Sequence, residues 1–301
     1  MASTSPFEPT AALSLLADCE AELMIGGSLE MSPERCGDAA AIASLLPSGT
    51  RVYVNHLPNH GLAQSLAALG SVRAAGLEPV PHIAARRITS RDELQNFLSE
   101  AVRSVGVSKV LLIGGDDPQA AGPFADGVEL LRERVLADAG LREVVLPGYP
   151  EGHPRIPQAA LDRALADKLD LAKAQGLTAA IVTQFSFAPA RIVEYCNELA
   201  RKFPGVPVYV GMAGPTNAAT LLRFAQRCGV SASLRAMGAQ GMGAVRMLMH
   251  TEPSDQLRAV AQYCLRHADC NVVGAHLFSF GAVAKSAQWM NRVITARGAP
   301  I

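Results

Sequence analysis

The chain has 301 residues, 49% of them hydrophobic, and its 27 basic and 27 acidic side chains give a formal net charge of zero at pH 7. A chain of this length can bury a large core, either as one α/β barrel or as two smaller domains. The balanced charge and the lack of any lysine or arginine run argue against a nucleic-acid partner, because such proteins present a basic patch to the phosphate backbone.

The first residues and the apolar runs predict a cytoplasmic protein. Residues 1–22 contain Glu8, Asp18 and Glu20, and they lack the basic start and apolar centre of a signal peptide. No segment approaches the roughly 18 consecutive apolar residues of a membrane span. We therefore expect no membrane partner.

Eight short apolar runs predict strands, and amphipathic stretches between them predict helices. The strands are expected at residues 21–31, 51–55, 78–84, 109–115, 143–149, 179–185, 207–213 and 271–280. Helices are expected at 90–105, 158–175, 189–203, 216–228, 239–250 and 254–267. Continuous apolar strands that alternate with helices indicate a parallel sheet buried on both faces.

Eight such units predict a single (β/α)8 TIM barrel domain over residues 1–301. We expect an extra N-terminal helix and, at 239–250, an extra helix before the last strand. The alternative is an open doubly wound sheet, which would carry a Gly-x-Gly-x-x-Gly turn after its first strand. The nearest match, at residues 238–243, has the wrong spacing and follows no predicted strand.

Polar side chains stand where the predicted strands end. They are Glu30, Asn55, His82, Asp116 with Asp117, Tyr149 with His153, and Gln184. In a barrel these groups converge on one mouth. Two carboxylates among amide, imidazole and phenol groups suit acid–base chemistry on a polar heterocycle. Glycines such as Gly115 would let backbone amides approach a ligand closely.

The cysteines and the remaining histidines have simpler interpretations. The six cysteines form no Cys-x-x-Cys pair, so we interpret them as reduced core residues. The cluster of Cys264, His267 and Cys270 matches no familiar zinc spacing, and no metal is predicted. The other histidines are interpreted as surface or loop residues; they are His56, His60, His250, His267 and His276.

Five motifs follow one another along the predicted strands. They are Ser28-Leu-Glu-Met-Ser-Pro33, Pro81-His82, Gly115-Asp116, Tyr149-Pro-Glu-Gly-His-Pro154 and Thr183-Gln-Phe-Ser-Phe187. In this order they resemble the methylenetetrahydrofolate reductase family, over residues 22–293. The resemblance implies a flavoprotein of one-carbon metabolism that interconverts 5,10-methylenetetrahydrofolate and 5-methyltetrahydrofolate. It implies non-covalent FAD, a folate substrate, NAD(P)H as a candidate electron donor and a homo-oligomer.

The resemblance also assigns roles to matching residues. Glu30 aligns with the general acid that protonates the bridging nitrogen of the folate. Asp116 aligns with the aspartate that stabilises the resulting cation, and Gln184 aligns with the glutamine that orients the pterin. The expected FAD contacts are Asn55, His82, Gly115, Asp116, Phe124, Ala125, Asp126, Tyr149, His153 and Lys168.

Each of these residues also has a structural interpretation. Glu30 alone would suit an ion pair at a strand end, and the two aspartates would suit helix N-caps. Between these two, we favour Asp116 as the functional residue and Asp117 as its structural partner. His82 and His153 would suit scaffold roles, and Tyr149 an aromatic core position.

The chain departs from the family pattern at several places. The family's Arg-Gly-Asp is here Gly114-Gly-Asp116, Asn55 replaces a threonine, and Ala218 replaces a stacking phenylalanine in the seventh loop. The last strand carries residues 280–282 (Phe-Gly-Ala) instead of Asn-Arg, with Lys285 beyond.

These departures leave open which molecule exchanges electrons with the flavin and in which direction the reaction runs. The protein could reduce the folate with NAD(P)H bound in a different way, or it could oxidise methyltetrahydrofolate and pass the electrons to another acceptor. Two alternatives to redox chemistry remain, a folate-binding or methyl-carrier protein and a pterin-linked methyltransferase.

Overall fold

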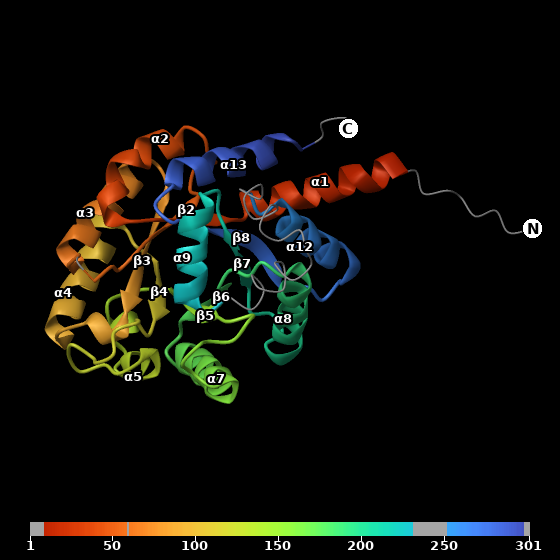
Figure 1. Ribbon diagram of the computed structural model, residues 1–301. Coiled ribbons are helices and arrows are strands. Elements are labelled where there is room, and N and C mark those ends of the chain that lie inside the picture. Colours follow the sequence, from red (N-terminus) through yellow and green to blue (C-terminus); the bar gives the residue numbers. More distant parts are fainter. Residues whose placement is uncertain (1–8, 59, 231–251, 298–301) are drawn as a thin grey trace, which may run out of the picture.

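A closed barrel of eight parallel strands forms the centre of the computed structural model, which describes residues 9–58, 60–230 and 252–297 (Figure 1). The strands are β1 (Ser28–Met31), β2 (Arg51–Val54), β3 (Glu78–Ala84), β4 (Lys109–Ile113), β5 (Glu143–Gly148), β6 (Thr178–Thr183), β7 (Val208–Ala213) and β8 (Val272–Phe278). Each strand pairs with the next in chain order, and β8 closes on β1. The predicted TIM barrel is confirmed.

Helices cover the outside of this barrel (Figure 1). The α-helices are α1 (Pro9–Ile25), α2 (Ala39–Ala43), α3 (Leu62–Ala74), α4 (Arg91–Glu100), α5 (Gly127–Arg132), α6 (Val135–Asp138), α7 (Gln158–Ala174), α8 (Pro189–Lys202), α9 (Ala218–Cys228), α12 (Ser254–Arg266) and α13 (Val283–Thr295). Short turns of other helix types occupy η1 (Pro33–Asp38), η2 (Ala85–Arg87) and η3 (Ala101–Val105). The helix predicted at 239–250 lies outside the described residues. Within the described part of the chain, no helix has both the length and the apolar character needed to cross a membrane.

The first predicted strand, residues 21–31, is wrong over its first half. Helix α1 continues to Ile25, and the strand begins only at Ser28. A short apolar run suits a helix as well as a strand, and here Ala21 and Met24 are buried on one helical face while Ile25 is exposed. Gly26 and Gly27 end the helix, and a Cβ on Gly26 would lie 2.4 Å from the Val273 carbonyl oxygen. The extra N-terminal helix is therefore present but longer than expected.

The barrel interior is a separate small core. Its buried members are Tyr53, Val80, Leu111, Val145, Ala180, Val182 and Tyr209. Beneath them the Arg51 guanidinium lies 4.3 Å from the centre of the Tyr209 ring and donates hydrogen bonds to the Tyr209 hydroxyl and to the Gly26 carbonyl. The apolar interior lowers the local dielectric below the barrel mouth. Ionisable groups that stand above it therefore have little water on that side.

Candidate active site

Glu30 stands at the carboxyl end of β1, between two imidazole rings. Its side chain is 13% exposed, and its Oε1 lies 3.8 Å from His82 Nε2 on β3 and 3.7 Å from His276 Nε2 on β8. Neither Nε2 atom has a hydrogen-bond partner among the described residues, although both are buried. The Asn55 amide, at the end of β2, also lies near the carboxylate and lowers its pKa. The structure thus brings together three predicted residues, Glu30, Asn55 and His82.

His276 is the residue of this centre for which the sequence analysis predicted no role. The prediction of a surface or loop position is wrong, because its side chain is fully buried. Its Nδ1 lies 2.8 Å from the Ser28 hydroxyl. Ser28 and His276 are paired in the β1–β8 ladder, and Glu30 follows Ser28 on the same face of β1. One signal was present in the sequence: a lone histidine within an apolar strand run.

The environment of Glu30 controls its charge. Burial raises the pKa of this carboxyl, but the His276 and His82 imidazoles and the Asn55 amide outweigh burial and hold the pKa below its ordinary value. Burial lowers the pKa of His82 to about 4, against the opposing effect of Glu30, so His82 is neutral at neutral pH. The centre therefore contains an ionised carboxylate in its resting state. A proton for acid catalysis must come from a neighbour or from solvent.

Asp116 lies on the rim of the mouth rather than in its buried centre. Its side chain is 56% exposed, and its carboxylate oxygens lie 3.6 Å from Arg155 Nη2 and 3.4 Å from Arg227 Nη2. Asp117 instead forms an ion pair with Arg87, at 2.7 Å. Exposed ion pairs contribute little free energy. A ligand can therefore displace the two arginines from Asp116 at little cost.

Helix α9 lies across this end of the barrel (Figure 1). Its residue Phe224 packs on Phe280, with ring centres 4.6 Å apart, next to Phe185 and Phe278 of the same apolar cluster. Ala218, which the sequence resemblance aligned with a stacking phenylalanine, begins this helix. The nearest aromatic ring of α9 is thus Phe224, six residues further along.

Gln184 meets the end of α9. Its Oε1 accepts a hydrogen bond from the Phe185 backbone N–H at 3.1 Å, and its side chain lies near the Cys228 thiol, whose pKa it lowers. Burial, together with the charges of Glu30 and Asp116, raises the pKa of this thiol to about 12. Cys228 is a free thiol packed against the phenylalanine cluster, as interpreted from the sequence, and it also lies beside a candidate substrate-binding amide.

Tyr149 and His153 lie after β5, with their rings perpendicular and 5.5 Å apart. The Tyr149 backbone N–H donates to the Tyr195 hydroxyl at 3.1 Å, and burial raises the pKa of the Tyr149 phenol to about 12. Burial lowers the pKa of His153, whose Nδ1 accepts from the Arg155 backbone N–H at 3.2 Å. Both rings are thus uncharged at neutral pH and offer a polar aromatic edge beside Asp116.

Lys168, a predicted FAD contact, lies on α7 where that helix packs against α5. Its side chain is only 9% exposed, and none of the carboxylates in the described residues lies within ion-pair distance of its amine. Burial lowers its pKa to about 8, opposed by the charge of Asp126. Asp126 caps α5 by accepting hydrogen bonds from the N–H groups of Val128 and Glu129. A buried amine without a close counter-charge fits a phosphate group of a ligand.

The remaining predicted residues shape the loop after β4. Gly115 has φ +97°, a left-handed conformation that favours glycine. Phe124 is fully buried and Ala125 is exposed. The Ala125 N–H donates to the Glu129 carboxylate at 2.7 Å. These contacts connect the loop after β4 to the start of α5.

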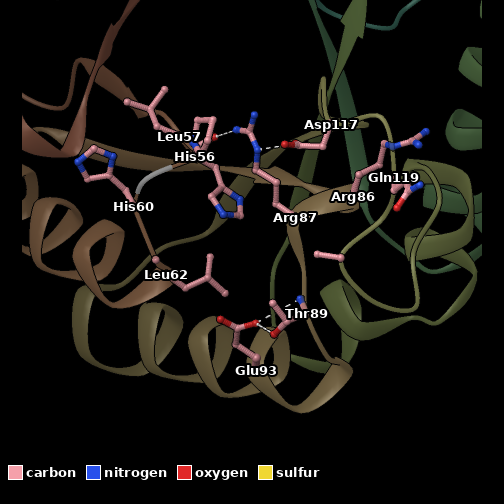
Figure 2. Close-up of a pocket in the computed structure, with 13 residues that line it drawn as sticks. His56, Leu57, His60, Leu62, Arg86, Arg87, Thr89, Glu93, Asp117 and Gln119 are labelled. Carbon is pink, nitrogen blue, oxygen red and sulfur yellow. Dashed lines mark hydrogen bonds and ion pairs between the residues drawn. The ribbon is translucent and has the colours of Figure 1, made fainter.

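A cavity of about 480 Å³ opens beside the mouth, among the loops that follow β2, β3 and β4. Figure 2 shows Arg87 bridging His56 and Asp117 across it. His56 lies in the loop after β2, as predicted, but it is buried, and its Nδ1 accepts a hydrogen bond from the Ala84 N–H at 3.3 Å. The predicted site residues do not line this cavity.

Comparison with known proteins agrees with this geometry. The family model described as methylenetetrahydrofolate reductase matches residues 62–237, more than half of the chain. A similar structure is an uncharacterized protein from Clostridium thermocellum that binds two copies of 5-methyl-5,6,7,8-tetrahydrofolic acid; it is 13% identical, with a TM-score of 0.53 over 88% of this chain and 95% of that one. A putative phosphonomutase from Burkholderia cenocepacia is 12% identical, with a TM-score of 0.52 over 95% and 96%. At these identities the two structures show a shared fold.

Proposed function

Because the chain belongs to the methylenetetrahydrofolate reductase family, we propose that it is an FAD-dependent oxidoreductase that interconverts 5,10-methylenetetrahydrofolate and 5-methyltetrahydrofolate. One observation carries this proposal: a buried carboxylate, Glu30, stands at the barrel mouth with the Asn55 amide and two imidazoles around it. The folate ligand of the Clostridium thermocellum protein supports the choice of substrate class.

Glu30 delivers the proton in this proposal. In the reducing direction, an Oε–H bond of Glu30 breaks and an N–H bond forms on the bridging nitrogen of the folate. The C–N bond then opens, its electron pair stays on nitrogen, and an electrophilic iminium carbon remains. General acid catalysis of this kind contributes roughly two to four orders of magnitude in rate. In the oxidising direction the carboxylate takes the same proton back.

In this proposal Asp116 stabilises the charge of the folate cation, and Gln184 orients the pterin ring. The Asp116 carboxylate stabilises the positive charge that the ring opening creates, once the folate has displaced its exposed arginine partners. The Gln184 amide offers one acceptor and two donor hydrogens to the pterin edge. Its neighbour here is the Cys228 thiol, a weak hydrogen-bond partner that a pterin can replace.

The residues present fit FAD. Lys168 offers a buried amine to a pyrophosphate, and the left-handed Gly115 lets the β4 loop turn without a side chain over the ligand. Tyr149, His153 and His82 would line the flavin. Bound FAD would supply the hydride carrier, which this chain's side chains cannot replace.

The absorbance spectrum of the purified protein tests the proposal. We expect a flavin band that bleaches when methyltetrahydrofolate is added without oxygen. The variant E30Q serves as the control, since it keeps the band but reacts slowly with folate. A colourless protein that contains no FAD yet binds methyltetrahydrofolate would instead indicate the folate-binding alternative.

Titration of the purified protein with NADH identifies its electron partner. If NADH bleaches the flavin and supports turnover, the protein works as a reductase despite Gly114 and Ala218. If NADH does neither while methyltetrahydrofolate does bleach the flavin, the protein works toward methyltetrahydrofolate oxidation with another acceptor. The proposed homo-oligomer is tested by light scattering on the purified protein.

A further inference from the structure

We propose that Cys264 and Cys270 form a reversible disulfide, with hydrogen peroxide as the oxidant and a dithiol as the reductant. This inference goes beyond the proposed function and does not depend on it. The two thiols are free in this structure, and their sulfur atoms lie 3.2 Å apart, within hydrogen-bond distance. A disulfide bond is about 2.05 Å long, so the sulfurs need to approach each other by only about 1 Å.

The turn between α12 and β8 brings the two cysteines together. Cys264 lies in the last turn of α12, which ends at Arg266, and Cys270 stands two residues before β8. The Cys270 N–H donates to the His267 carbonyl at 3.1 Å, which closes a tight turn. On the other side, the Asn271 carbonyl accepts from the first N–H of β7 at 2.9 Å. Backbone hydrogen bonds therefore hold the chain on both sides of Cys270.

Small oxidants can reach this pair of thiols. Cys264 and Cys270 each pack one side against the main core, but both are only partly buried. The residues between them, 265–269, are all exposed. By contrast, Cys196 is fully buried on α8, and the folded protein shields its sulfur from solvent.

Cys270 is the thiol that is suited to attack the peroxide. Contact with the Cys264 thiol lowers the pKa of Cys270, against partial burial. The Val272 backbone amide and the His267 imidazole lower this pKa further, and the Asp269 carboxylate opposes them. The same contact between the thiols, together with burial, raises the pKa of Cys264. Because the thiolate is the nucleophile, Cys270 attacks first and Cys264 resolves the product.

The oxidation balances as two steps. In the first, the Cys270 thiolate attacks one oxygen of hydrogen peroxide, the O–O bond breaks, and the departing hydroxide takes up a proton to become water. The sulfur is now a sulfenic acid. In the second, Cys264 loses its proton and attacks the Cys270 sulfur, the S–O bond breaks, and a second water leaves. Two electrons pass from the thiols to the peroxide, and a dithiol returns them when it reduces the bridge.

Other partners for these thiols are less suited. The His267 ring faces Tyr263 instead, with Nδ1 2.9 Å from the Tyr263 carbonyl oxygen and ring centres 4.4 Å apart. In the described part of the chain, no group of three histidine, cysteine or acidic residues is arranged to hold a metal ion. Cys19, on α1, directs its thiol to the Ala261 carbonyl oxygen at 3.7 Å. Across the described residues, no other two thiols lie in hydrogen-bond contact.

Tryptic mapping tests the bridge directly. Trypsin cleaves after Arg266, so the two cysteines fall on separate peptides, residues 259–266 and 267–285, and neither peptide contains another cysteine. The purified full-length protein is reduced, treated with hydrogen peroxide, alkylated and digested without reductant. We expect the two separate peptides to be lost and replaced by one joined species with two hydrogens fewer. Dithiothreitol should restore the separate peptides.

Two variants assign the roles, and a third is the control. In C264S the sulfenic acid of Cys270 has no resolving thiol, so dimedone should label it, and without dimedone it should oxidise further to sulfinic acid. In C270S, Cys264 should remain a thiol under the same conditions. C36S is the matched control, since Cys36 is also a partly buried free thiol but has no thiol partner among the described residues. The bridge should form in C36S as in the wild type.

Three results would overturn the inference. The two peptides could stay separate at a peroxide concentration that oxidises Cys36, the bridge could join Cys270 to Cys19 instead, or it could form only between two copies of the chain, as a gel without reductant would show. Mapping of the wild type needs no variant, so it decides the matter even if C264S or C270S fails to fold. Since neither flavin nor folate takes part, the result is independent of the proposed function.

Discussion

Replacing Lys168 with methionine should stabilise the protein and weaken its binding of FAD. The substitution removes a buried ammonium group and keeps an unbranched apolar stem. Burial lowers the pKa of Lys168 from 10.5 to about 8. Since one pKa unit corresponds to about 1.4 kcal/mol, holding this amine charged costs the cofactor-free fold on the order of 3 kcal/mol. We expect K168M to gain up to that amount at neutral pH.

The pH dependence has a definite sign. The folded pKa lies below the unfolded value, so the unfolded chain binds more protons between about 8 and 10.5. The free energy of unfolding of the wild type should therefore rise with pH through this window, and the cost should be complete below it. K168M should lack the rise. At the same time, loss of a charged hydrogen bond to phosphate should weaken FAD binding about tenfold to a hundredfold.

Urea unfolding of the cofactor-free proteins measures the first effect, and quenching of flavin fluorescence measures the second. Lys173 lies on the same helix but is exposed, so K173M is the matched control. Its stability should change by less than about 0.5 kcal/mol, with FAD affinity unaltered. A K168M protein that is less stable than wild type at neutral pH would refute the electrostatic reasoning. Unchanged FAD affinity in that variant would refute the phosphate contact.

Three other variants test separate parts of the site. E30Q should keep its circular dichroism spectrum and its flavin while losing roughly two to four orders of magnitude in folate turnover; near-normal turnover would place the acid elsewhere. In G115A the free energy of unfolding, measured in urea, should fall by about 1–3 kcal/mol because Gly115 has a φ of +97°, and FAD should bind more weakly. The control is G49A, at φ +77° and far from the site, which should lose stability without any change in FAD binding. D116N should change stability by less than about 1 kcal/mol because its ion pairs are exposed. Its folate turnover should nevertheless fall, and equal turnover in D116N and wild type would remove this residue from the chemistry.

The barrel and the residues at its strand ends could be predicted because both depend on local pattern. Apolar runs of strand length alternate with amphipathic helices, and a polar residue directly after such a run stands at the mouth of a barrel. This reasoning placed Glu30, Asn55 and His82 at one end of the fold, where the structure has them together. It failed at residues 21–25, where an apolar run too short to show its period belongs to a helix.

Contacts between distant segments could not be predicted in this way. Phe224 and Cys228 belong to a helix whose amphipathic pattern is ordinary, and nothing local indicates that it lies across the mouth beside Gln184. Arg227 reaches Asp116 from 111 residues away. The position of α9 depends on the packing of its phenylalanine cluster, which also involves the loop after β6 and the end of β8.

The sequence by itself determined the architecture, the end of the barrel at which the chemistry stands and, through ordered motifs, the family. Only the tertiary structure decided which ionisable groups share an environment. Closure of β8 on β1 brings His276 to Ser28 across 248 residues and places it beside Glu30, and the packing of α7 against α5 buries the Lys168 amine. Charge and proton affinity depend on burial and on neighbours within a few ångströms, and these are properties of the closed barrel rather than of any segment of the chain.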